Sequence, residues 1–92
     1  MIERFGSRWV LLVLLTLHEM GTLRFSELGR VVPGNISERM LAATLRDLEQ
    51  ADLVVRKVYP EVPPRVEYAL APKGVSLMPV LKPLLAWAEE NA

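Results

Sequence analysis

The chain has 92 residues, of which 51% are apolar, and its 11 basic side chains balance its 11 acidic ones. That length fits one domain, residues 1–92, with a modest core, and zero net charge means that no overall field draws the chain to nucleic acid or membrane. The lack of cysteine excludes a disulfide framework, a thiolate metal site and a cysteine nucleophile. Nothing reads as a cleavable signal, and the apolar run at residues 9–17 is shorter than the roughly 20 residues of a membrane span, so we expect a cytoplasmic protein.

The first third of the chain predicts two helices around a short extended segment. Residues 8–20 form a helix that ends near Gly21, a residue typical of helix C-termini. Residues 23–25 are extended. Ser26 is expected to cap a short helix, "ELGRVV", which ends at Pro33.

The middle of the chain predicts a longer helix and a hairpin. Ser37 is expected to cap a helix over residues 37–51, in which apolar residues recur at helical spacing. Residues 53–59 and 65–70 alternate in the manner of strands, and the proline-rich segment between them forms the tip.

The last element predicted is a helix that runs from Pro72 toward Trp87. Pro79 and Pro83 lie inside it, so we expect it to be kinked or split near Met78. The resulting order is helix, short strand, helix, helix, hairpin, helix. Two helices joined by a tight turn and followed by a hairpin are a winged helix-turn-helix, a mostly helical α+β fold whose hairpin is the wing.

The outward face of the helix at residues 37–51 is a candidate DNA-contacting surface. Small alanines allow close approach, and arginines can reach phosphates or a guanine edge. The candidate residues are Ser37, Arg39, Ala42, Ala43 and Arg46. The alternative is an ordinary solvated helix face, which Glu38 and Asp47 favour because they dilute the positive charge.

The wing combines stiffness with positive charge. Prolines 60, 63 and 64 fix backbone angles and lower the entropy lost when the tip is ordered against a partner. Arg56, Lys57 and Arg65 flank this tip and suit phosphates or a narrow minor groove. Prolines that only protect an exposed hairpin are the alternative, and Glu61 at the tip argues mildly against strong phosphate contact.

The two terminal helices are apolar on more sides than one small core covers, which predicts a two-fold dimer interface. The candidate interface residues are Trp9, Leu11, Leu14, Leu81, Leu84 and Trp87. A plain core or a lipid-contacting surface would produce a similar stripe.

Three stretches of the sequence also carry a resemblance. They are "SRWVLLVLLTL", "LRFSELGRVVPGNISERMLAATLRDLEQADLVVRKVYPEVPPRVEYALAPKG" and "LMPVLKPLLAW", which together cover nearly the whole chain. They resemble the HxlR-type family of bacterial winged-helix transcription regulators, relatives of the MarR type. The resemblance implies a homodimer that binds a palindromic operator, with residues 37–51 as the recognition helix and residues 56–68 as the wing.

Three positions depart from the family pattern. The cysteine that many relatives carry before the first helix is missing, so the thiol sensing of some relatives is not expected here. Asp52 replaces the usual glycine after the recognition helix, and because aspartate tolerates a left-handed conformation better than most residues we expect the turn to survive. Ala71 replaces a frequent threonine N-cap, a loss that typically costs about 1 kcal/mol.

These patterns predict a dimeric transcription regulator, a repressor or an activator, that binds double-stranded DNA. The main rival is a winged-helix protein–protein module without DNA binding, which gains if Glu27, Glu38, Asp47 and Glu61 all point at the DNA face. An enzyme is not expected, because His18 is the only histidine and no catalytic or metal-ligand cluster accompanies it. No cofactor is expected. A small aromatic effector is compatible with a roomy apolar seam, but no residue pattern specifies one.

Overall fold

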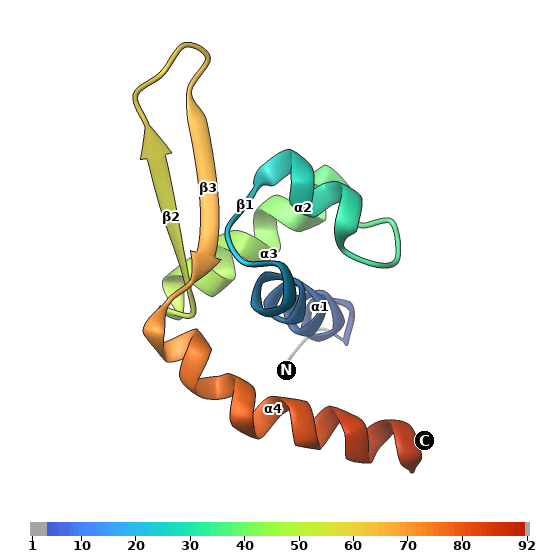
Figure 1. Cartoon of the computed structure of the whole chain (residues 1–92). Coiled ribbons are helices and arrows are strands. Elements are labelled where there is room, and N and C mark those ends of the chain that lie inside the picture. The colour runs from blue at the N-terminus through green and yellow to red at the C-terminus, as the bar shows by residue number, and fades with distance from the viewer. Residues whose placement is uncertain (1–3, 92) are drawn as a thin grey trace.

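A computed structural model describes residues 4–91 of the chain. This part of the chain forms four helices and a three-stranded sheet, whose arrangement Figure 1 shows. The elements are, in order, α1 (Arg4–Met20), β1 (Leu23–Arg24), α2 (Phe25–Val31), α3 (Glu38–Gln50), β2 (Val54–Tyr59), β3 (Arg65–Leu70) and α4 (Pro72–Glu90). This order confirms the α+β class and the predicted winged helix-turn-helix.

Two predicted helix ends are confirmed by their local geometry. Helix α1 stops at Met20 because Gly21 adopts a φ of 84°, which glycine reaches without steric cost. The hydroxyl of Ser37 accepts a hydrogen bond of 3.1 Å from the backbone N–H of Met40, so Ser37 is the N-cap of α3. Ser37 therefore fixes where α3 begins.

The start of α2 differs from the prediction. The helix begins at Phe25, so Ser26 lies inside its first turn and is not its cap. Arg24 occupies the N-cap position, and its backbone N–H donates to the Glu27 carboxylate at 2.7 Å. The acidic side chain reaches back three residues, as in one half of a capping box, and replaces the hydroxyl that the prediction required.

The turn after α3 requires one residue in the left-handed region. Asp52 has a φ of 62°, which confirms that aspartate supports the turn where glycine was expected. The chain then enters β2 at Val54.

The sheet is antiparallel with strand order β1-β3-β2. The hairpin register runs from Val54 opposite Leu70 to Tyr59 opposite Arg65, and Leu23 of β1 lies opposite Tyr68 on the other side of β3. Figure 1 shows the hairpin extending well beyond the helices, with β2 as a free edge strand. The base of the hairpin is therefore anchored in the core while its tip projects as a wing.

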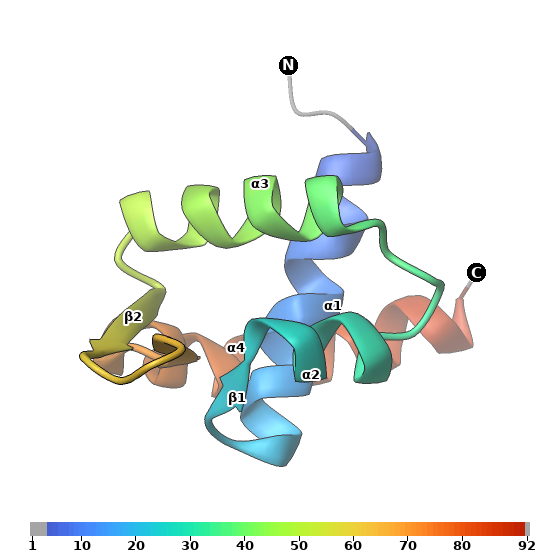
Figure 2. The same ribbon diagram turned by 90° about the horizontal axis from the view of Figure 1, so that it is seen from above.

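Helix α1 lies at the centre of the molecule, and Figure 2 shows α3 crossing over it. It contacts α2, α3, β3 and α4, which covers most of its circumference. Among the large apolar residues of α1 whose burial is described, only Met20 is exposed. The chain's own elements therefore cover much of the apolar surface of α1, and a contribution of its half-buried residues to a dimer interface stays a prediction.

Helix α4 is continuous despite Pro79 and Pro83, so the predicted split does not occur. Each proline removes one backbone donor from the helical ladder, and Figure 1 shows the helix turning between its first turns and its C-terminal half. Met78 and Leu81 anchor it to the core. None of the helices in the described part of the chain has the combination of length and apolar character needed to cross a bilayer.

Candidate nucleic-acid interface

Helix α3 separates an apolar face from a basic one. Its buried residues are Leu41, Thr44, Leu45 and Leu48. At about 100° per residue, Arg39 and Arg46 lie on the opposite side of the helix, and both are exposed. The helix therefore points its two arginines directly away from the core.

The surroundings of these arginines allow close contact with a surface. Ala42 and Ala43 are half-buried and lie beside them on the helix. Their short side chains do not project from the surface of α3. Neither Arg39 nor Arg46 forms an ion pair within the part of the chain that the structure describes. Both guanidinium groups are thus available to a ligand.

The four acidic residues named above do not all face outward alongside them. Glu27 is half-buried and accepts the Arg24 hydrogen bond, while Glu61 pairs with Arg65 at 3.2 Å. Glu38 and Asp47 are exposed and, by the helical repeat, lie on the two flanks of the basic strip of α3. The protein-interaction alternative required all four acids on the DNA face, and half-buried Glu27 does not meet that condition.

Arg56 and Lys57 of the wing are both exposed but point to opposite faces of the hairpin. Arg56 shares its face with buried Val54, the face that packs on the helices, and β2 contacts α3. Lys57 lies opposite Glu67 on the other face. The structure thus brings Arg56, but not Lys57, to the side of the sheet where α3 lies.

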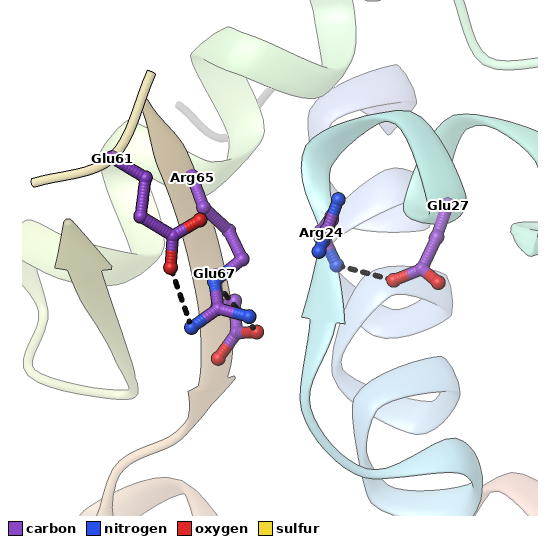
Figure 3. Close-up of polar contacts among 5 residues, drawn as sticks. All are labelled: Arg24, Glu27, Glu61, Arg65 and Glu67. Carbon is purple, nitrogen blue, oxygen red and sulfur yellow. Dashed lines mark hydrogen bonds and ion pairs between the residues drawn. The ribbon is translucent and has the colours of Figure 1, made fainter. Parts of the chain in front are cut away.

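Arg65 is not the free cation that the sequence suggested. Its guanidinium lies 3.2 Å from the Glu61 carboxylate and 3.7 Å from that of Glu67, and it stacks 4.1 Å above the ring of Tyr59. Figure 3 shows the Arg65 side chain pointing between the two glutamates. The signal was present in the sequence, because Glu61 is four residues before Arg65 and Glu67 is two residues after it on the same strand face.

Only some of the candidate dimer residues are at the surface. Leu14 is 1% exposed and Leu81 is 6% exposed, and both pack in the core of the single chain, so their assignment to an interface was wrong. Trp9 and Leu11 are half-buried. Leu84 and Trp87 are 57% and 62% exposed and lie on the outer side of α4.

Taken together, a tight helix pair with a basic outer face and a projecting hairpin define a winged helix-turn-helix protein. The chain matches the model of the HxlR-like helix-turn-helix family over residues 4–92, and it belongs to this family. Its relatives are named as transcriptional regulators and not as enzymes.

Two relatives illustrate the similarity. An uncharacterized HTH-type transcriptional regulator of Methanothermobacter thermautotrophicus is 51% identical over 88 residues, which are 96% of this chain and 66% of that protein. This chain thus spans just under two thirds of that relative's length. The reduced form of the transcriptional regulator YodB from Bacillus subtilis superimposes with a TM-score of 0.80 at 41% identity, covering 94% of this chain and 82% of the other.

Proposed function

We propose that the chain is a homodimeric transcription regulator that binds palindromic double-stranded DNA through α3 and the wing. The observation that carries this proposal is the pair of exposed arginines at positions 39 and 46, on the side of α3 opposite the core, neither of which forms an ion pair with residues 4–91. Ala42 and Ala43 beside them leave room for a duplex to approach.

In helix-turn-helix proteins the N-terminal residues of the recognition helix meet base edges in the major groove. Ser37 and Arg39 hold that position in α3. The Arg39 guanidinium can donate two parallel hydrogen bonds to O6 and N7 of a guanine, the commonest specific contact of this kind. Arg46, two turns later, and Arg56 on the wing are the proposed phosphate contacts, which position the protein without reading sequence.

The test is selection of bound duplexes from a random library, followed by titration of the best duplex. Arg39→Ala is expected to weaken binding by roughly 1–3 kcal/mol and to relax the preference at one base pair in each half-site. Lys82→Gln is the control for the loss of one positive charge, because Lys82 lies on α4, away from α3, and makes only an exposed ion pair with Glu19 at 3.4 Å among the described residues. An equal loss on all sequences would assign Arg39 to phosphate, and no enrichment of any duplex would refute the proposal.

A winged-helix protein–protein module remains the second candidate. Zero net charge and the exposed acids Glu38 and Asp47 beside the basic strip favour it. The two functions differ in salt dependence, because neutralised phosphates release counterions and make binding to any duplex weaken steeply between about 50 and 200 mM salt. Absence of duplex binding even at low salt would put the protein–protein module first.

A further inference from the structure

The tip of the wing has no apolar core to hold it. Residues 60–64 are all exposed, and an open groove of about 460 Å³ lies between residues 61–66 of the tip and residues 24–26 at the start of α2. The tip is therefore not buttressed by the helices. Its position depends on contacts inside the hairpin itself.

Arg65 makes those contacts. It is the first residue of β3 and the last partner in the ladder, opposite Tyr59. One face of its guanidinium covers the Tyr59 ring at 4.1 Å, while its edge approaches Glu61 at 3.2 Å and Glu67 at 3.7 Å. The side chain thus connects the strand before the prolines, the loop itself and the strand after them.

In this arrangement the Arg65 guanidinium is poorly placed to bind a phosphate. The guanidinium already contacts two carboxylates and the Tyr59 ring, and the Arg65 side chain is only 30% exposed. Arg56, in contrast, is exposed and forms no ion pair within the described part of the chain.

We propose that Arg65 is a positioning residue that holds the wing tip in place through Tyr59, Glu61 and Glu67, and that it does not itself bind the DNA backbone. The planar guanidinium stacks and pairs at the same time, which a lysine ammonium cannot do. The inference rests on the proposed DNA binding for its functional consequence. The ordering of the wing tip by Arg65 does not depend on DNA binding and can be measured on the chain alone.

The DNA test compares Arg65→Gln, Arg65→Lys and Glu61→Gln in the full chain on the duplex that wild type selects. Loss of a preordered tip predicts a roughly three- to tenfold weaker affinity for Arg65→Gln, with an unchanged slope of log affinity against log salt. Glu61→Gln should weaken binding in the same way although it removes a negative charge, and the double variant should be no worse than either single one. Arg65→Lys should not restore binding.

Opposite results identify a phosphate contact and overturn the proposal. Neutralising such a contact lowers the salt slope by about 0.9, Arg65→Lys then restores much of the affinity, and Glu61→Gln tightens binding by freeing the cation. Unchanged affinity in Arg65→Gln equally overturns a positioning role.

A second measurement separates this inference from the proposed function. Amide order parameters of Glu61 and Val62 should fall in Arg65→Gln and in Glu61→Gln, but not in Lys57→Gln, which removes a neighbouring cation that makes no ion pair within the described residues. If wild type binds no duplex, the proposed function fails, while a loss of tip order still supports the positioning role and unchanged order overturns it.

Discussion

At the scale of single residues, Gly74 has the least room for a side chain among the glycines whose surroundings are described. A Cβ atom at position 74 would clash with the Leu53 carbonyl oxygen. That oxygen also accepts a hydrogen bond of 2.9 Å from the Ala71 backbone N–H. It cannot withdraw without breaking the hydrogen bond that joins the start of α4 to the residue just before β2.

Gly74→Ala is therefore expected to destabilise the protein by about 1–3 kcal/mol, or more if the hydrogen bond is lost. For a domain of this size that corresponds to a fall in Tm of roughly 5–20 °C, measured by thermal unfolding at one protein concentration. Gly29→Ala is the control. Its Cβ would make ordinary contact with Leu41 at 3.9 Å inside α2, so Tm should stay unchanged or rise. Equal Tm values for the two variants would contradict this account of Gly74.

Ala71 is a second residue that affects stability, because it cannot cap the helix that follows it. It is the N-cap of α4, with extended backbone angles and no side-chain hydrogen bond. Ser37, with similar angles, caps α3 through its hydroxyl. Ala71→Ser should thus raise the free energy of unfolding by about 1 kcal/mol, and Ser37→Ala should lower it by a similar amount. Chemical denaturation measures both, and a destabilised Ala71→Ser would mean that the new hydroxyl finds no backbone donor.

At the scale of elements, the wing carries on opposite faces two cations that form no ion pair among the described residues. Arg56 faces the side on which the helices pack, and Lys57 faces away. A duplex that meets α3 is therefore expected to contact Arg56 and not Lys57. Strand alternation, which is visible in the sequence, already separates the two residues once the buried face is known.

Arg56→Gln should weaken binding almost equally on all DNA sequences and lower the salt slope by about 0.9. Lys57→Gln should change the slope much less. Titrations of both variants over a range of salt concentrations make the comparison, since each variant removes one exposed positive charge from the same strand. A larger change in Lys57→Gln would place the duplex on the other face of the hairpin.

The elements were predictable from the sequence because each has local signals. Glycine at position 21, the Ser37 cap and the alternation of residues 65–70 act within a few residues of the structure they cause. The start of α2 was mispredicted because two local signals compete there, and the Glu27 carboxylate prevails over the Ser26 hydroxyl. The pairing of Arg65 was missed because charge was counted along the chain and not across the strand face.

At the scale of the whole molecule, periodicity shows that a helix is apolar but not what covers it. Leu14 was assigned to an interface because α1 is apolar on every side, yet the chain's own α2, α3, β3 and α4 surround that helix. Only the three-dimensional arrangement distinguishes core from interface. On α4, a stripe formed by Val80, Leu84 and Trp87 stays uncovered, and these residues are 66%, 57% and 62% exposed.

The spacing of this stripe, four and then three residues, places the three side chains on one face of α4. Val75 is equally apolar and 53% exposed, but the helical repeat places it on another side of the helix. Because large side chains exposed together mark interaction sites, we propose that this stripe is the centre of the dimer interface. The stripe adjoins Leu81 and Leu85, which pack on the core.

Leu84→Glu is therefore expected to convert the dimer into a folded monomer, because the charge would enter a desolvated seam. Sedimentation velocity at micromolar concentration measures the conversion. Val75→Glu, an equally large polar change at a similarly exposed position, should remain dimeric. Leu14→Glu should instead unfold the chain, since that side chain lies in the core. A wild type that is a folded monomer, or a Leu84→Glu variant that stays dimeric, would contradict the placement of α4 in the interface.

Loss of the dimer in Leu84→Glu should also weaken binding to a palindromic duplex, while the affinity for a single half-site should stay nearly unchanged. The wing and α3 of each chain would still be intact, but they would no longer be joined to a second copy.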